Sequence, residues 1–449
     1  MSKSIFAFDT LSRPGRREWL AIAGVAVLTL LFLLAVLQKT LVFEQGDVRV
    51  FFHAAWAVWT GYPLYGFTDQ HGWPYHYPPT LGLLLGPFAY PLPGYPQPWW
   101  AMPFPAAVGV WYLINAACLL LALHVWANAL TRYRPAQEPT GFLQWPWLIR
   151  FGPLLALLVF IGTGLERGQP EPILLLLMVS FLALYEEGRV ASASSAFALA
   201  VSIKLFPAVL AVIPLCRRDG KFIVWAAGWC ALFLVGLPIV CIGPTATLDL
   251  YRTLLSQRLA GFLSVSMPTE LASWVSPGAY RSVSVGSVLG RIAAGGAFYA
   301  SALPGWVSAL QYLFNAGVIA AVVILGRGGF WNLRGAQPAR GYPILLAGAI
   351  LSAAIPLMIP FAKNHYVTFA LPLMGVFMIE AWRRTGRLVT GAMMAWAILA
   401  WMSMLAFELP WTWLKIIGPT TWTLLLIGPA SLSLLAKHSK VSAQPMTAG

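Results

Sequence analysis

Residues 46–79 read GDVRVFFHAAWAVWTGYPLYGFTDQHGWPYHYPP, and the rest of the chain is organised around them. The stretch directly follows the first long apolar segment, residues 19–42, and is rich in Tyr and Trp. Its acidic and imidazole side chains are Asp47, Asp69, His53, His71 and His76. Since most of the remaining chain is apolar, we expect a polar, aromatic loop at the mouth of a helix bundle.

The composition predicts that lipid is the solvent for most of the chain. Of 449 residues, 59% are hydrophobic and only 10% are charged, whereas soluble domains carry about 25% charged residues. The formal net charge of +14 would suit nucleic acid, but basic residues in short loops between apolar segments are typical of membrane orientation. The sequence holds no basic, aromatic-interleaved soluble domain, so we expect no nucleic-acid partner.

The cysteines and the N-terminal segment both favour a membrane protein. Four cysteines lie in or at the ends of apolar segments: Cys118, Cys216, Cys230 and Cys241. Their spacing matches no metal site or disulfide framework, so we interpret them as small buried apolar residues. Residues 19–42 are too long for the apolar region of a cleaved signal peptide and no A-x-A site follows, so we expect an anchor.

Ten apolar stretches approach the length of a transmembrane helix, which needs about 20 residues. They are residues 19–42, 104–130, 147–165, 170–186, 221–243, 304–326, 341–360, 365–382, 388–407 and 415–436. Two more are interrupted: 79–93 by prolines, and 192–216 at Lys204-Leu205-Phe206-Pro207. If both are re-entrant or interfacial, the main Lys and Arg clusters fall on one side, which the positive-inside rule favours. A short, tilted crossing by 79–93 is the alternative.

We therefore predict an all-α polytopic membrane protein with ten full crossings, two re-entrant or broken segments and both termini in the cytoplasm. Residues 1–440 form one transmembrane domain, and residues 441–449 have the composition of a disordered tail. Non-helical backbone at membrane depth must be buried in protein or line a cavity. Because both broken segments open on the outer side, we expect an outward-facing cavity there.

Asp47 is the candidate general base. Apolar residues recur after it at helical spacing: Val48, Phe51, Phe52, Ala55, Trp56 and Trp59. This pattern predicts an interfacial amphipathic helix that begins at Asp47. An ionised carboxylate there is favoured by the helix dipole and is available to accept a proton. A solvated surface carboxylate is the alternative.

Lys204 lies inside an apolar run, where a Lys costs about 2.5–3.5 kcal/mol at a helix centre and marks a functional site by default. At the apex of a broken helix its ammonium would face the cavity and bind phosphate; snorkelling to the interface is the alternative. Further side chains on the same side suit the anionic and hydroxyl groups of a substrate. They are Arg167, Lys363, His365 and, more weakly, Arg258 for phosphate, and Gln169 for a sugar hydroxyl. A solvated turn or an interfacial anchor is the simpler role for each.

The histidines and aromatic residues of the first loop have two interpretations. His53, His71 and His76 match no zinc spacing, so we expect no metal. The chain also has no Walker loop and no GxGxxG, and we expect no cofactor. His76, Tyr77 and Tyr65 are candidates for contacts with a sugar ring or an acceptor, although aromatic residues at this depth are most often an interfacial belt.

Together these patterns resemble glycosyltransferase family 87, of the GT-C superfamily. The first loop carries Gly46-Asp47, Trp59-Thr60-Gly61-Tyr62-Pro63-Leu64-Tyr65 and Tyr75-His76-Tyr77-Pro78-Pro79. Later matches, in the family's order, are Gly168-Gln169, Ile203-Lys204-Leu205-Phe206-Pro207 and His365-Tyr366. The resemblance covers about residues 19–410. Two departures bear on the acceptor: Arg281-Ser282-Val283-Ser284 stands where many members carry Asn-Gln-Ser, and His365-Tyr366 where many carry a His pair.

The resemblance implies a GT-C helix bundle and a donor of mannose or a related sugar on a polyprenyl phosphate. The acceptor would be a lipid or glycan, and the active site would face the outer side of a bacterial cytoplasmic membrane. The family's first-loop Asp is the catalytic base, which maps to Asp47. Lys204, helped by Arg167, Lys363 or His365, would then stabilise the leaving phosphate during a single displacement with inversion.

Two other classes of function remain open from the residues alone. A transporter or flippase of lipids or lipid-linked sugars also uses broken helices and an intramembrane Lys. However, the chain shows no repeat, and its polar residues gather on one side of the membrane. An acyl- or phosphotransferase of the envelope would need a His-Asp or metal cluster, which the sequence does not supply.

Overall fold

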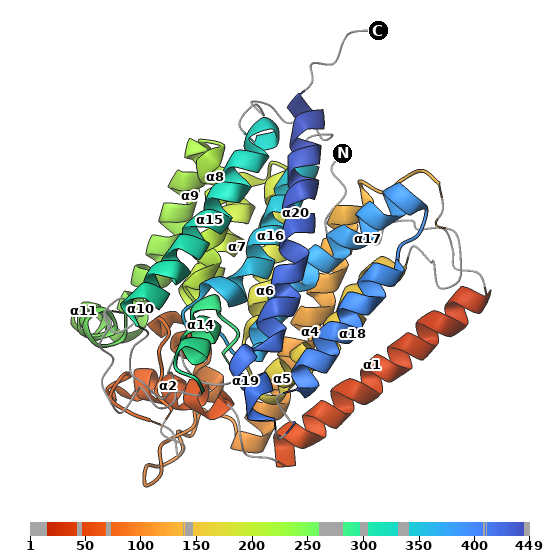
Figure 1. Ribbon diagram of the computed structural model, residues 1–449. Helices are drawn as coiled ribbons and strands as arrows, with labels where there is room; N and C mark the ends of the chain where they lie inside the picture. Colours follow the sequence, from red (N-terminus) through yellow and green to blue (C-terminus); the bar gives the residue numbers. More distant parts are fainter. Residues whose placement is uncertain are drawn as a thin grey trace.

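The computed structural model is a helix bundle with most of its short elements at one end (Figure 1). It describes residues 16–42, 47–68, 73–137, 139, 147–259, 282–296, 304–330, 341–406, 409 and 411–443. Within these ranges the regular structure is helical, with two isolated β-bridges. The all-α prediction is therefore confirmed for the described part of the chain.

Seven helices of this part are long and apolar enough to cross a membrane. They comprise α1 (Arg16–Val42), α4 (Phe104–Thr131), α5 (Leu148–Glu166), α9–α10 (Gly220–Ile242), α15 (Gly305–Phe330), η6–α17 (Asn364–Thr385) and the C-terminal segment that contains α20 (Pro419–Ala443). A multi-pass membrane protein follows from this finding. α20 continues through Ala443, into the segment expected to be a tail; residues 444–449 lie outside the described part.

Three other predicted crossings are helices of lesser length. They are α6 (Glu171–Glu186), α16 (Tyr342–Met358) and α18 (Gly391–Leu405), with 16, 17 and 15 residues. At 1.5 Å per residue, such helices reach about 22–26 Å, less than the roughly 30 Å of the hydrocarbon core. Ten full crossings therefore remain a prediction.

Both interrupted segments break where the sequence indicates. α7 (Val190–Ile203) ends at Lys204, whose backbone is extended, and the chain continues in η2 (Phe206–Ala211) and α8 (Val212–Cys216). Figure 1 shows α8 beside α9 at the end of the bundle opposite α2, as a re-entrant segment requires. Residues 79–93 contain only α3 (Pro79–Leu84) and η1 (Gly86–Phe88), and neither piece is long enough to cross.

α2 (Val48–Thr60) forms as predicted, and other parts of the protein cover it. The side chains from Val48 to Val58 are all buried. α3 packs so closely on α2 that a Cβ atom at Gly82 would lie 3.3 Å from the carbonyl oxygen of Ala54. α2 therefore packs within protein from Val48 to Val58, and its position at the membrane interface stays a prediction.

The core of the bundle lies between α4, α6, α7, α16 and α17, whereas α1, α9 and α15 expose many apolar side chains. Such exposed apolar surface on outer helices is typical of lipid contact. The remaining short elements are α11 (Pro244–Thr253), η4 (Leu254–Leu259), α14 (Val285–Ala293) and α19 (Thr412–Ile417). α11, α14 and α19 lie at the same end as α2, so this end carries most of the irregular backbone (Figure 1).

Candidate functional site

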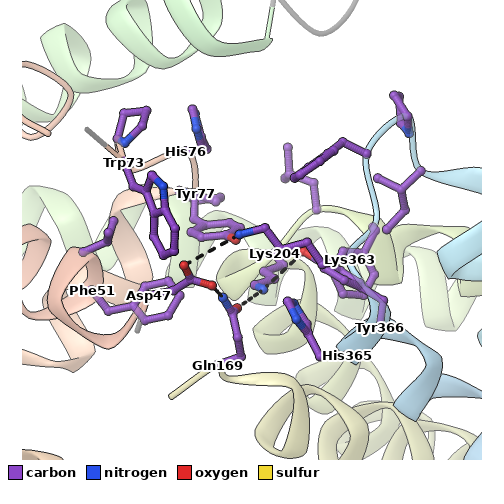
Figure 2. Close-up of a pocket in the computed structure, with 18 of the residues that line it drawn as sticks. Asp47, Phe51, Trp73, His76, Tyr77, Gln169, Lys204, Lys363, His365 and Tyr366 are labelled. Atoms are coloured by element: carbon purple, nitrogen blue, oxygen red, sulfur yellow. Dashed lines mark hydrogen bonds and ion pairs between the residues drawn. The ribbon is translucent and has the colours of Figure 1, made fainter. Parts of the chain in front are cut away.

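A cavity of about 470 Å³ lies where the start of α2, the break after α7 and the segment after α16 meet (Figure 2). Its polar lining residues are Asp47, His76, Tyr77, Gln169, Lys204, Tyr312, Asn315, Lys363, His365 and Tyr366. Phe51, Leu205, Phe206, Ile359 and Phe361 are among the apolar ones. Segments up to about 300 residues apart in the sequence thus contribute to one cavity.

The turn between α5 and α6 holds the start of α2. The Val48 amide donates a hydrogen bond to the Arg167 carbonyl oxygen at 3.1 Å. Gly168 has a φ of 66°, and a Cβ atom there would lie 2.6 Å from the Val48 Cβ, so both the backbone conformation and the space require glycine. Glycine at position 168 therefore lets the start of α2 pack against this turn. The same contact places Asp47 beside the next residue of the turn, Gln169.

Asp47 occupies the N-cap position of α2; its side chain is 11% exposed and makes no cap hydrogen bond. Oδ2 accepts a hydrogen bond from Gln169 Nε2, and Gln169 Oε1 accepts one from Lys204 Nζ at 3.0 Å. This amide orientation is required, since a carboxylate only accepts and an ammonium only donates. Figure 2 shows Gln169 between Asp47 and Lys204.

Two further cations flank the Asp47 carboxylate. Lys363 Nζ lies 3.8 Å from Oδ1 and Arg167 Nη1 lies 3.8 Å from Oδ2. Both cations also face the Trp73 ring, at 4.6 Å and 5.4 Å from its centroid. Burial raises the pKa of Asp47, but Lys363, Arg167 and the hydrogen bond from Gln169 lower it, and the resulting pKa lies below its usual value. Asp47 is therefore ionised at neutral pH.

Besides its hydrogen bond to Gln169, the buried Lys204 ammonium has further polar and aromatic partners. Its ammonium pairs with Glu171 Oε1 at 2.7 Å, and both side chains are 1% exposed. It also donates a hydrogen bond to the Tyr366 hydroxyl at 3.4 Å and lies 4.6 Å from the centroid of the Tyr77 ring. These partners satisfy an ammonium that would otherwise be too costly to bury.

His365 lies beside this pair. Its Nε2 atom is 3.6 Å from Glu171 Oε1, its side chain is 1% exposed, and its ring stacks on Tyr366. Sequence reasoning overlooked Glu171 as a site residue. The signal was present, because a Lys inside an apolar run needs a nearby carboxylate, and Glu171 begins the helix that follows Gln169.

A family model, glycosyltransferase family 87, matches residues 75–360, more than half of the chain. The chain belongs to glycosyltransferase family 87. The resemblance inferred from the motifs is thus confirmed, and with it a membrane glycosyltransferase of the GT-C superfamily. No curated protein and no solved structure matched the chain. The matched range contains Gln169 and Lys204, whereas Asp47 and Lys363 lie outside it.

The predicted site residues of this glycosyltransferase fall into three groups. Asp47, Gln169, Lys204, Lys363, His365, His76 and Tyr77 line the cavity, and Arg167, which is not among the lining residues, lies 3.8 Å from Asp47. Tyr65 does not line it; its buried hydroxyl donates a hydrogen bond to the Tyr77 carbonyl oxygen at 2.9 Å. Arg258 lies at the end of the described helical segment, and its side chain lies outside the described part of the structure, as do His71, Asp69 and Arg281.

Of the two described histidines of the first loop, His76 lines the cavity and His53 does not. His53 Nδ1 lies 2.8 Å from the Tyr90 carbonyl oxygen and its ring stacks on Tyr90, away from the cavity lining. Among the described residues, no three His, Cys, Asp or Glu side chains are arranged to hold a metal ion.

The charges of the glycosyltransferase site favour an anionic ligand. Arg167, Lys204 and Lys363 carry three positive charges, and Asp47 and Glu171 carry two negative ones. One positive charge remains in a largely apolar cavity, where electrostatic interactions are stronger than in water. A phosphate group beside Lys363 and Arg167 would balance this charge, and the Asp47 carboxylate lies within the same cluster.

Proposed function

We propose that this family 87 member transfers one sugar, mannose or a related hexose or pentose, from a polyprenyl phosphate to an acceptor hydroxyl. The observation that carries the proposal is the Asp47–Gln169–Lys204 bridge, which joins an ionised carboxylate and a cation in one cavity. Apolar side chains such as Phe206, Ile359 and Phe361 on the same cavity suit a lipid-linked donor.

Asp47 is the proposed general base. Its Oδ2 atom already accepts from Gln169, whereas its Oδ1 atom accepts no hydrogen bond from any described residue and lies 3.8 Å from Lys363. This distance is an ion-pair contact that is too long for a hydrogen bond. Oδ1 is therefore the atom that accepts the proton of the acceptor hydroxyl.

The reaction is a single displacement at the anomeric carbon. The acceptor oxygen forms a bond to that carbon as its proton moves to Asp47, and the bond from the carbon to the phosphate oxygen breaks. Its electron pair leaves on the polyprenyl phosphate, which gains negative charge. Lys363, Arg167 and Lys204 stabilise that charge, and attack opposite the leaving group inverts the configuration.

Donor binding also prepares the base. Lys363 and Arg167 lower the pKa of Asp47. A phosphate that pairs with the same cations brings an opposing charge, so the pKa of Asp47 rises towards a value better suited to a general base. Donor binding therefore precedes proton transfer to Asp47.

We further propose that the cavity faces the outer side of a bacterial cytoplasmic membrane. The short basic loops, including Arg132, Arg217 and Arg387, lie towards the ends of helices that point away from the cavity, as the positive-inside rule requires of a cytoplasmic side. A lipid or glycan hydroxyl would then reach Asp47 from outside the cell.

The experiment is a donor panel. The purified protein in lipid nanodiscs is incubated with polyprenyl-phosphate mannose, polyprenyl-phosphate arabinofuranose and the nucleotide sugars as contrast, together with a membrane extract as acceptor. Mass spectrometry identifies the product and NMR gives its anomeric configuration. Transfer from a lipid-linked donor with inversion is expected, and transfer from nucleotide sugars alone would refute the proposal.

A further inference from the structure

We propose that Arg291, in the last turn of α14, positions the Lys363 ammonium beside Asp47 by clamping the extended segment 282–284. The inference rests on the proposed function, because it assigns a residue that places a donor-binding cation. Arg291 does not line the cavity itself. It acts through three layers of contacts, which connect α14 and α19 to the segment after α16.

The first layer is the guanidinium of Arg291. The residue is 0% exposed, and both Nη1 and Nη2 donate hydrogen bonds to the Ser282 carbonyl oxygen at 3.1 Å. Its Nε atom donates one to the Ile416 carbonyl oxygen, in the last turn of α19, at 3.3 Å. A planar fork with fixed donors holds two backbone segments in register in a way that a flexible ammonium does not.

The second layer joins Ser282 to Lys363. The two residues form an antiparallel β-bridge. The Val283 amide donates a hydrogen bond to the Ala362 carbonyl oxygen at 2.7 Å, and the Ala362 amide donates one to Ser282 Oγ at 3.3 Å. The backbone that carries Lys363 is therefore paired directly with the residue that Arg291 holds.

A cluster of three serine hydroxyls fixes the other end of the same segment. Ser284 and Ser287 each donate a hydrogen bond to the Pro360 carbonyl oxygen, at 3.1 Å and 3.2 Å. Ser282 Oγ lies 2.7 Å from Ser287 Oγ. Residues 360–363 are thus attached at both ends to the N-terminal region of α14.

The joint between α19 and α20 is shaped to admit Arg291. Gly418 has a φ of 66°, and a Cβ atom there would lie 2.9 Å from Arg291 Nη2. Thr421 Oγ1 donates a hydrogen bond to the Val283 carbonyl oxygen at 2.8 Å. α14, α19 and α20 therefore converge on the segment that pairs with Lys363, far along the chain from the family's first-loop motifs.

The third layer is the tip of Lys363. Its ammonium lies 3.8 Å from Asp47 Oδ1 and 4.6 Å from the Trp73 centroid, on a flexible stem. A Lys stem alone does not define a position, so the paired backbone and the indole ring together define it. Misplacement of a catalytic-site group by about 1 Å reduces activity by up to about 100-fold.

The test is a double-mutant cycle on donor kinetics in nanodiscs. Arg291→Lys keeps the charge and removes the fork; we expect the KM for the donor to rise about tenfold and kcat to fall, because Lys363 both binds the donor and stabilises the leaving phosphate. In a Lys363→Ala background, Arg291→Lys should cause no further rise, because its effect passes through Lys363. A general loss of folded protein would instead lower the apparent kcat in both backgrounds and leave the donor KM unchanged.

Arg150→Lys is the matched control. Arg150 is also a buried arginine, and it binds His124 and Asn128 at the opposite end of the bundle. Its substitution should leave the donor KM unchanged in both backgrounds. If Arg291→Lys does not fold, Ser282→Ala, which removes only one hydroxyl, gives the same readout with an expected rise of about threefold.

The outcomes separate this inference from the proposed function. If the effects of Arg291→Lys and Lys363→Ala multiply, the positioning role of Arg291 is refuted while the transfer reaction stands. The same holds if the variant leaves the donor KM at the wild-type value. If Asp47→Asn transfers sugar at the wild-type rate, the proposed base fails whatever the cycle shows.

Discussion

Replacing Asp47 with Asn tests the reaction at its centre. The amide has the shape of the carboxylate, and its oxygen can take the place of Oδ2 and still accept from Gln169. Its NH2 group then occupies the place of Oδ1 and faces the acceptor hydroxyl and Lys363, where it donates and cannot accept a proton. The substitution therefore removes the base and preserves the bridge to Lys204.

The magnitude follows from these contacts. A positioned general base contributes about 10²- to 10⁴-fold to the rate, which corresponds to about 2.7–5.4 kcal/mol in activation free energy. Donor binding should not weaken, because loss of the carboxylate changes the local charge from one excess positive charge to two. We thus expect kcat to fall by at least about 100-fold with a donor KM that is unchanged or lower.

The assay is transfer from the lipid-linked donor in nanodiscs, with the fraction folded measured by thermal unfolding. Asp219→Asn is the matched control, because Asp219 also precedes a helix, α9, and accepts hydrogen bonds from the Phe222 amide and the Tyr185 hydroxyl. It should retain full transfer. Wild-type turnover by Asp47→Asn, or an equal loss in both variants, would refute the role of Asp47.

Three further predictions concern stability, pH and orientation. Glu171→Gln leaves Lys204 buried without its carboxylate and should lower the unfolding free energy by about 3–5 kcal/mol, whereas Glu171→Gln with Lys204→Met should cost less; thermal and denaturant unfolding in detergent measures both. Lys363→Ala removes a cation that lowers the pKa of Asp47, so that pKa rises. Since the base works only when ionised, the acid limb of the pH–rate profile should move to higher pH. A Cys at position 96, introduced as Pro96→Cys, should react with an impermeant thiol reagent added outside the cell.

Each of these has a control and a contrary result. Equal stability losses in the single and double variants would show that Lys204 and Glu171 do not act as a pair. An acid limb that stays in place in Lys363→Ala, while the control Lys221→Ala at the start of α9 behaves as wild type, would contradict the electrostatic role of Lys363. The labelling uses a variant without the four native cysteines, and exclusive cytoplasmic labelling of position 96 would reverse the proposed orientation.

Much of the site was predictable because local signals mark it. A carboxylate before an amphipathic stretch predicted Asp47 at the start of α2, and a Lys next to Phe-Pro in an apolar run predicted the break after α7. Each signal depends on a property of neighbouring residues. Proline interrupts a helix, and a charged ammonium in hydrocarbon is unfavourable unless it has a partner. The pairing of Lys204 with Glu171 and the part played by Gln169 as a bridge were not predictable in this way.

The sequence alone determined that lipid surrounds most of the chain, that the fold is helical, and which family the chain belongs to. These conclusions depend on composition, on the length of apolar runs and on short motifs, which are all properties of neighbouring residues. Only the tertiary structure decided that α2 is covered by protein, that Asp47 and Lys204 share one cavity, and that Arg291 reaches Lys363 through Ser282. These contacts join residues between about 10 and more than 150 positions apart. Their geometry depends on how helices pack and on which buried polar groups must find partners, and no local pattern encodes that choice.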